Sequence, residues 1–152
     1  MSKPHIMIVE ARFYDDIIDE MATGAIEAIE EAGGTYERFE VDGAFELPAA
    51  ISYAVLHQEM EDSHVYDGYL ALGCVIRGET SHYDYVCGES ARGLMNLATD
   101  HALAVGYGVL TVENRDQAWA RARRSEKNKG GEVARACLNQ IKLKTHFGLY
   151  PR

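Results

Sequence analysis

Short runs of strand-forming residues alternate along this chain with longer stretches in which apolar residues recur at helical spacing. The strand-like runs are residues 6–9, 35–41, 69–73 and 105–112, the last interrupted by Gly106 and Gly108. The clearest helical stripe consists of Ile17, Ile18, Met21, Ala25, Ile26 and Ile29. This alternation is typical of one α/β domain, which we expect to occupy residues 1–152.

Local start and stop signals predict helices between and after these strands. Asp15 or Asp16 is expected to cap the first helix, and Gly33-Gly34 ends it. A second helix is expected to begin at about Glu46, with Pro48 in its first turn. The remaining expected boundaries are a second-helix end near Gln58, a third helix from His82 or Tyr83 to Ala102, a fourth from Asp116 to Arg123, a break at residues 127–131 and a last helix to about Leu143.

Strands separated by helices indicate a parallel sheet with both faces covered. We therefore predict a three-layer sandwich, with a central four-stranded parallel sheet flanked by helices. Ligands bind such sheets beyond the carboxyl ends of the strands. The loops there are residues 11–14, 42–45, 74–81 and 113–114, so we expect functional side chains to cluster in these segments.

The chain is acidic, with a net charge of −9 and a pI of about 5.1. Nucleic acids and anionic membranes bind positive surfaces, so neither is an expected partner. A phosphate group could still bind, but only through a few local cationic side chains. No apolar stretch approaches the ~20 residues of a membrane span. Met1–His5 leads directly into a short apolar run, so we expect no secretory signal.

Cysteine and histidine spacing limits the chemistry that the chain can perform. Cys74, Cys87 and Cys137 form no CxxC pair, and their odd number fits no closed disulfide framework, so we expect reduced thiols in a cytoplasmic protein. The six histidines show no HxxxH or similar spacing, so no metal site is expected. The sequence has no nucleophile elbow, Walker loop or GxGxxG motif, and nothing in it favours a covalent or nucleotide-dependent mechanism.

The loop between Gly73 and His82 follows a predicted strand and opens a predicted helix. Free N–H groups and the dipole at a helix start favour an anion there, Gly78 allows close backbone approach, and Thr80 and Ser81 add hydroxyl groups. A turn followed by an N-cap explains the same residues. His82 is suited to proton transfer near neutral pH, and the alternative is a structural or solvated histidine.

A second loop, residues 43–46, offers an aromatic ring, exposed backbone groups and a carboxylate near a helix start. Glu46 either accepts hydrogen bonds from a polyhydroxyl chain or only favours the helix dipole. Phe13, in another loop, either stacks on a flat ring or packs onto the following helix. The residues alone do not decide between the binding and the structural roles of Glu46 and Phe13.

One dense basic cluster stands out in this acidic chain. Its members are Arg121, Arg123, Arg124, Lys127 and Lys129. A run of charges is usually a solvated face, but arginine is also the side chain that matches a phosphate bidentately.

Taken together, these segments resemble lumazine synthase along nearly the whole chain and in the same order. The matching segments are residues 11–13, 43–48, 72–86, 110–114 and 127–131. The most specific is Val75 to Tyr85, with the sequence VIRGETSHYDY, and Gly43 to Pro48, GAFELP, adds to it. The resemblance implies a flavodoxin-like topology for the predicted sandwich.

The lumazine synthase family joins 5-amino-6-ribitylaminouracil to 3,4-dihydroxy-2-butanone 4-phosphate. The products are 6,7-dimethyl-8-ribityllumazine, phosphate and water, in the penultimate step of riboflavin biosynthesis. Imine formation, phosphate elimination, ring closure and dehydration all need proton transfers, and all gain from holding two small molecules in register. The resemblance therefore implies a transferase that uses neither a metal nor an organic cofactor.

By position, the resemblance also implies roles for individual residues. Those expected at the pyrimidine and its ribityl chain are Phe13 as a stacking ring, Ala44, Phe45 and Glu46 around the chain and ring, and Cys74, Val75 and Ile76 through their backbone groups. Those expected near the phosphate are Glu79 and Thr80 at the helix start, Arg121, and Lys129 close by. His82 matches the proton-transfer residue of the family.

Assembly is part of this resemblance, because the family's site lies between adjacent subunits of a pentamer. Tyr107 falls where the neighbouring subunit usually contributes an aromatic residue. The resemblance thus implies a homo-oligomer, either a pentamer or a multiple of pentamers such as a decamer or a hollow shell.

Three features depart from the family pattern. Asp42 stands where a proline often precedes Gly43, so this loop is expected to be less rigid but still functional. Cys74 replaces a common threonine, and its backbone roles should persist. The amino terminus is short, which puts a strand exchanged with the neighbour, and shell formation, in doubt. Two other functions stay open: a lumazine- or flavin-binding protein without turnover, and a mainly structural shell protein.

Overall fold

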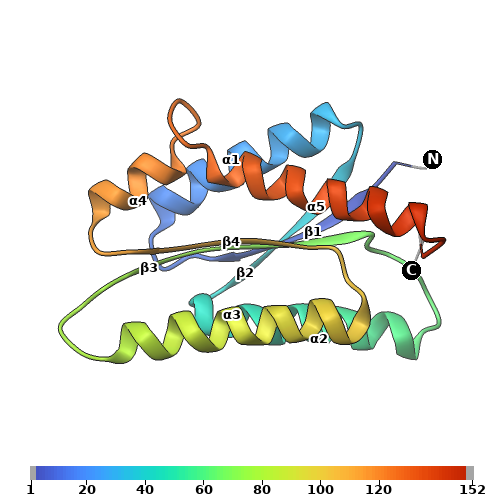
Figure 1. Cartoon of the computed structure of the whole chain (residues 1–152), viewed down its shortest axis with the longest axis horizontal. Coiled ribbons are helices and arrows are strands. Elements are labelled where there is room, and N and C mark those ends of the chain that lie inside the picture. The colour runs from blue at the N-terminus through green and yellow to red at the C-terminus, as the bar shows by residue number, and fades with distance from the viewer. Residues whose placement is uncertain (1–2, 150–152) are drawn as a thin grey trace.

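A four-stranded parallel sheet lies between two layers of helices in the computed structural model, which describes residues 3–149 (Figure 1). The strands are β1 (His5–Ala11), β2 (Thr35–Val41), β3 (Gly68–Ile76) and β4 (Val105–Val112), in the order β2-β1-β3-β4. The helices are α1 (Asp15–Glu31), α2 (Leu47–Met60), α3 (His82–His101), α4 (Arg115–Ala122) and α5 (Lys129–His146), and a 3-10 turn, η1 (Ala44–Glu46), precedes α2. The predicted fold class is confirmed.

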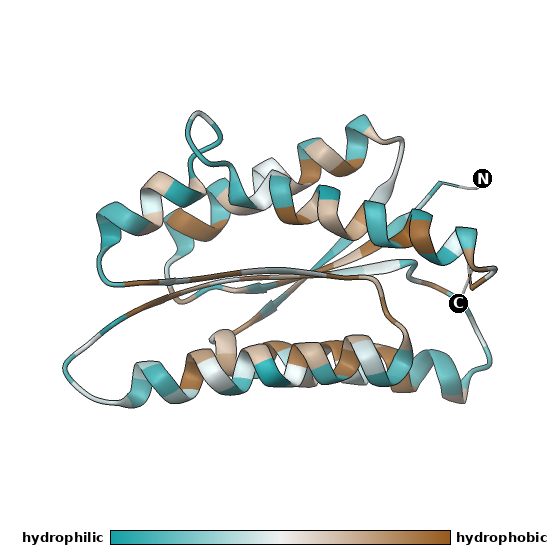
Figure 2. Cartoon of the chain, in the orientation of Figure 1, coloured by the Kyte–Doolittle hydropathy of each residue, from teal (hydrophilic) through white to brown (hydrophobic). Residues whose placement is uncertain are grey.

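The two faces of the sheet bury separate halves of the core. Successive side chains of a strand point to opposite faces, so Ile6 and Ile8 of β1 pack beneath α1, α4 and α5, whereas Met7 and Val9 face α2 and α3. Figure 2 shows the resulting distribution, with apolar residues along the sheet and on the inner sides of the helices. Burial on both faces explains why the central strands are almost continuously apolar.

The strand order creates a switch point between β1 and β3. The connection from β1 to β2 runs through α1 on one face, and the connection from β2 to β3 runs through α2 on the other face (Figure 1). The loop after β1 leads to α1 on the first face, and the loop after β3 leads to α3 on the second face. The two loops therefore diverge and leave a crevice at the carboxyl ends of these strands. This crevice is where the predicted loops meet.

Several element boundaries differ from those predicted. β3 continues to Ile76, because Val75 and Ile76 pair with Thr111 and Val112 of β4, so these two residues belong to a strand and not to a loop. Gly106 does not interrupt β4, and a Cβ at this position would lie only 2.6 Å from the Val133 carbonyl oxygen of α5. This glycine therefore permits close contact between a strand and a helix.

The helices also begin and end at slightly different residues. α2 begins at Leu47 after η1, with Pro48 in its first turn as predicted, and α5 begins at Lys129, inside the expected break. The prediction that Asp15 or Asp16 caps α1 is wrong, because Tyr14 occupies the N-cap position and its side chain makes no capping hydrogen bond. Within residues 3–149, none of the helices combines the length and the apolar character that crossing a bilayer requires.

Candidate active site

A hollow of about 480 Å³ opens at the carboxyl ends of β1, β2 and β3. Its lining residues are Phe13, Tyr14, Asp42, Gly43, Phe45, Glu46, Cys74, Val75, Ile76, His82 and Val86. They come from the loop after β1, the loop after β2 with η1, the end of β3 and the first turns of α3, which lie far apart in the sequence. The structure thus brings together seven of the residues that the sequence nominated, and we call this hollow the ring site.

Two phenylalanine side chains at the ring site face solvent and not the core. Phe13 is 73% exposed and Phe45 is 56% exposed. The Phe13 ring packs edge-on against Tyr14, with ring centroids 4.9 Å apart, and so keeps a face open. Exposed rings beside a concave surface are suited to stacking on a flat heterocycle.

Glu46 has a local partner at the mouth of the ring site. One of its carboxylate oxygens accepts a hydrogen bond from the Gly43 N–H at 3.1 Å, which stabilises η1. A carboxylate has several acceptor positions, so the side chain can hold this loop and still accept from a ligand hydroxyl. Ala44, which we predicted to contact substrate, is buried below the loop and packs beside Gly73.

The end of β3 presents backbone groups to the ring site. Pairing of β3 with β1 stops at Leu72 opposite Glu10, whereas pairing with β4 continues to Ile76. Among the strand pairings that the structure describes, residues 73–76 therefore have a partner strand on one side only. Their remaining N–H and C=O groups can bind the polar edge of a planar ligand.

His82 is the first residue of α3 and borders the ring site. Its backbone N–H donates to the Thr80 hydroxyl at 3.3 Å, which is a local turn contact. Glu79 and Thr80 lie in the exposed loop before α3 and do not line the ring site. Arg77 secures this loop from outside: its guanidinium donates to Glu113 at 3.0 Å and lies over the Tyr83 ring at 4.2 Å.

Cys74 forms part of the ring-site wall but is not a nucleophile at neutral pH. Burial raises the pKa of its thiol to about 11, a nearby Arg115 opposes this shift, and Asp16 adds to it. A thiol with such a pKa stays protonated at neutral pH, and only the thiolate is an effective nucleophile. In the part of the chain that the structure describes, no group of three or more His, Cys, Asp or Glu residues is placed to hold a metal ion.

Three of the nominated residues lie in a second hollow of about 270 Å³. This β4-edge hollow is lined by Tyr107, Gly108, Val109, Leu110, Thr111, Arg121, Lys129, Glu132 and Val133. None of these residues borders the ring site within this subunit. Arg121 donates to the Gln117 carbonyl oxygen at 3.0 Å, and the Lys129 ammonium lies 2.9 Å from the Glu132 carboxylate.

The rest of the basic cluster is mostly engaged in surface ion pairs. Arg123 pairs with Glu126, and Arg124 pairs with Glu20 and Glu27 of α1. The interpretation as a solvated face is therefore correct for these two arginines. Arg121 has no ion pair among residues 3–149, and its charge is available to an anion.

Comparison with known proteins agrees with the geometry of the site. The model of the 6,7-dimethyl-8-ribityllumazine synthase family matches residues 3–145. A 6,7-dimethyl-8-ribityllumazine synthase of Agrobacterium fabrum is 57% identical over 148 residues, covering 97% of this chain and 99% of that protein. The 6,7-dimethyl-8-ribityllumazine synthase 1 of Rhizobium meliloti is 58% identical over 144 residues, covering 95% and 94%. This chain belongs to the 6,7-dimethyl-8-ribityllumazine synthase family.

Two residues that line the ring site were not predicted from the sequence. Tyr14 lines the ring site beside Phe13, and Val86 lies one helical turn after His82, on the same face of α3. Positions 13 and 82 supply the signal that would have found them, because their neighbours in the loop and along the helix share the same surface. Asp42 also lines the ring site, so the departure from the family pattern lies in the site itself.

A buried ion cluster fixes the turn that carries Phe13. The Glu10 carboxylate is 1% exposed, and its oxygens lie 2.6 Å from both the Arg12 and the Arg38 guanidinium groups. The Arg12 backbone N–H donates to the Val41 carbonyl oxygen at 3.1 Å, which joins the ends of β1 and β2. The sequence predicts that the strand ends at residue 9 and that Glu10 begins a polar loop, but β1 continues to Ala11 and buries the Glu10 side chain.

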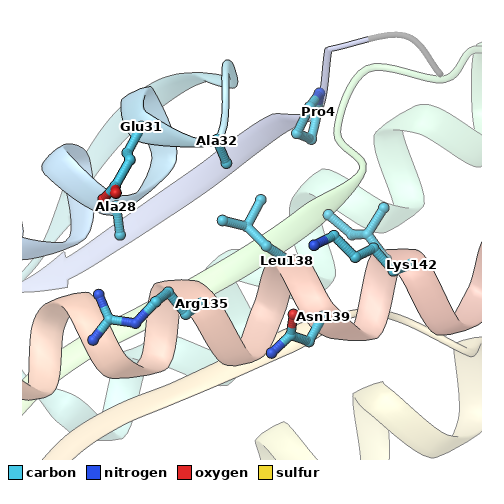
Figure 3. Close-up of a pocket in the computed structure, with 9 residues that line it drawn as sticks. Pro4, Ala28, Glu31, Ala32, Arg135, Leu138, Asn139 and Lys142 are labelled. Atoms are coloured by element: carbon cyan, nitrogen blue, oxygen red, sulfur yellow. The ribbon is translucent and has the colours of Figure 1, made fainter.

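A third hollow, of about 290 Å³, lies between α1 and α5 near the amino-terminal end of β1 (Figure 3). Glu31 of α1 and Arg135 and Lys142 of α5 stand around it, above an apolar floor that includes Leu138 (Figure 3). It lies at the opposite end of the sheet from the ring site and contains none of the nominated residues. We assign it no part in the site.

Proposed function

We propose that this chain, acting as a single domain, catalyses the condensation of 5-amino-6-ribitylaminouracil with 3,4-dihydroxy-2-butanone 4-phosphate to 6,7-dimethyl-8-ribityllumazine and phosphate. Membership of the family is the observation that carries the proposal, and the ring site supports it. A hollow with exposed aromatic rings, free strand backbone, a carboxylate and a histidine fits a ribityl-substituted pyrimidine. The reaction would take place in the cytoplasm, where its three free cysteines stay reduced.

In this proposal the ring site binds the pyrimidine and His82 transfers protons. Phe13 stacks on the ring, the end of β3 binds its polar edge, and Glu46 accepts from a ribityl hydroxyl. Imine formation and ring closure then each expel water, and phosphate leaves between them. No metal or organic cofactor is needed, because the amine and the ketone supply the reactive groups and His82 moves the protons.

The β4-edge hollow supports a site shared between subunits of a homo-oligomer, which we propose to be a pentamer or a multiple of pentamers. Arg121, Lys129 and Tyr107 would serve the phosphate end of the ring site of an adjacent subunit. The outer face of α2 is consistent with association, because Tyr53 and Met60 are large, apolar and mostly exposed. Glu79 and Thr80 would approach the same phosphate from the loop before α3.

Turnover of the purified protein with both substrates tests the proposed reaction. We expect lumazine absorbance to rise above the uncatalysed background, with one phosphate released for each lumazine formed. If the protein binds the aminouracil without turnover, the proposed enzyme function would be wrong and a lumazine- or flavin-binding function would take its place. Activity retained in monomers at high dilution would contradict the shared site.

Subunit complementation tests the sharing of residues directly. His82→Ala and Arg121→Ala variants are each expected to be nearly inactive as pure oligomers. When they are unfolded together in equal amounts and reassembled, about a quarter of the shared sites should receive both intact residues from different subunits. Absence of any recovered activity, with oligomers of normal mass, would place both residues in one subunit's site.

A further inference from the structure

Tyr14 breaks a local rule at the start of α1. It occupies the N-cap position with φ −115° and ψ 87°, and its side chain makes no capping hydrogen bond. Helix N-caps favour Asn, Asp and Ser because these side chains accept from the first free backbone N–H groups. A tyrosine here leaves the helix less stable than it could be. Departures from local preference concentrate at functional sites, so the ring needs another explanation.

The surroundings of Tyr14 provide that explanation. Its ring borders the ring site, half-buried, and meets the Phe13 ring edge-on at an interplanar angle of 71°. The two rings therefore form a corner, with Phe13 as the exposed wall and Tyr14 as the supported wall. A flat ligand in such a corner contacts both rings.

Arg115 holds Tyr14 from the side of α4. Its guanidinium carbon lies 5.5 Å from the centre of the Tyr14 ring, within range of a cation–π contact. The same guanidinium donates to the Asp16 carboxylate at 2.5 Å, which joins the starts of α4 and α1. Arg115 thus contacts one residue of the ring site, and its ion pair with Asp16 joins positions 99 residues apart in the sequence.

We propose that Tyr14 is a specificity-determining residue of the ring site, which packs against the edge of the bound pyrimidine, and that Arg115 and Asp16 are positioning residues that hold it there. The proposal deepens the proposed function and rests on it, because it assumes that the pyrimidine binds at Phe13. Besides carrying Arg121 for the phosphate, α4 would thus also position a residue at the pyrimidine end of the site.

Replacing Tyr14 by serine tests the proposal, since the change removes the ring and adds a good N-cap. We expect the affinity for the ribitylaminouracil, measured by calorimetry on the intact protein, to fall about three- to tenfold. The melting temperature should change little, because the N-cap that α1 gains offsets the packing lost with the half-buried ring. The KM for the butanone phosphate should not change. Tyr14→Phe, which keeps the ring, should restore most of the affinity.

Arg115→Gln tests the positioning role. Its aminouracil affinity should fall about two- to fivefold, whereas Arg92→Gln, which removes an exposed ion-paired arginine on α3, should have no effect. In the Tyr14→Ser background, Arg115→Gln should add no further loss, because the residue that it holds is gone.

Each outcome decides one part of the proposal. Unchanged aminouracil affinity in Tyr14→Ser would overturn it, and so would a loss of affinity that only follows a lower melting temperature. An equal loss on Arg115→Gln in both backgrounds would show that Arg115 acts through its own charge. Failure of the proposed function looks different, because the wild-type protein would then bind no aminouracil or give no turnover.

Discussion

His82 and Arg121 show how individual side chains can be prominent in the sequence without lying together in one subunit. His82 borders the ring site at the start of α3, and Arg121 lies in the last turn of α4 at the β4-edge hollow. The proposed function assigns proton transfer to His82 and anion binding to Arg121, which has no ion pair among the described residues. Substitution of each should therefore change a different kinetic constant.

Replacing His82 by alanine should lower kcat about 10²–10⁴-fold, because water would then have to transfer the protons in several steps. The affinity for the aminouracil should change much less, since the stacking and backbone contacts persist. Steady-state kinetics and calorimetry on the same preparation would separate the two effects. Turnover equal to that of the wild type would remove His82 from the mechanism.

Replacing Arg121 by alanine should raise the KM for the butanone phosphate about tenfold or more, because a charge-assisted contact is lost. Its neighbour Arg123, exposed and paired with Glu126, offers a matched control whose removal should leave KM unchanged. The measurement is KM for each substrate in turn. A similar loss of aminouracil affinity would point instead to a structural role for Arg121.

At the scale of elements, close contact between α1 and α5 places the segment that carries Lys129. A Cβ added at Gly130 would lie 2.0 Å from the Met21 carbonyl oxygen of α1, closer than any real contact. Asn128 caps α5 in the left-handed region, with φ 46°, and accepts from the Gly131 N–H. The start of α5 is thus seated on α1 by small residues and a cap.

Gly130→Ala should lower the free energy of unfolding by about 1–3 kcal/mol, because the two helices must move apart. Gly88 provides the matched control, because it is exposed within α3 and a Cβ added there would have no atom within 4 Å. Gly88→Ala should stabilise the protein by about 0.5–1 kcal/mol through helix propensity alone. Urea unfolding measures both; equal stability of the two variants would contradict the close contact.

At the scale of the whole molecule, buried thiols make the fold sensitive to alkaline pH. Burial raises the pKa of Cys137 from 9.0 to about 12, and burial raises that of Cys74 to about 11. Both folded-state values lie above the unfolded value, so the folded protein retains protons that the unfolded chain releases. The contribution to stability is therefore complete below about pH 9 and is lost as the pH rises through the folded-state pKa values.

The free energy of unfolding should accordingly fall between pH 9 and pH 11 by about 1.4 kcal/mol per pH unit for each of these thiols. Denaturant unfolding in a series of buffers from pH 7 to pH 11 measures the slope. A Cys137→Ala variant lacks one of these thiols, so its unfolding free energy should fall less steeply with pH. Any change in its stability at pH 7 reflects altered packing and not this slope. An unchanged slope would show that Cys137 does not titrate on unfolding.

The sequence by itself determined the order of elements and most members of the ring site. Strand alternation and helical spacing depend on residues near one another in the chain, so the parallel sandwich could be predicted from them. Loops at the carboxyl ends of parallel strands converge on one edge, which is why Phe13, Phe45, Glu46 and His82 could be placed together.

The tertiary structure alone decided the contacts between segments distant in sequence. Cross-strand pairing carried β3 on to Ile76, and the approach of α4 to α1 placed Arg115 over Tyr14. Glu10 is buried beside its near neighbour Arg12 and beside Arg38 of β2, which is 28 positions away in the sequence. Arg121 lies in a different hollow from His82, because α4 and the start of α5 pack on the α1 face of the sheet beside β4, whereas α3 begins on the opposite face. These contacts depend on how the layers pack, which no short stretch of sequence specifies.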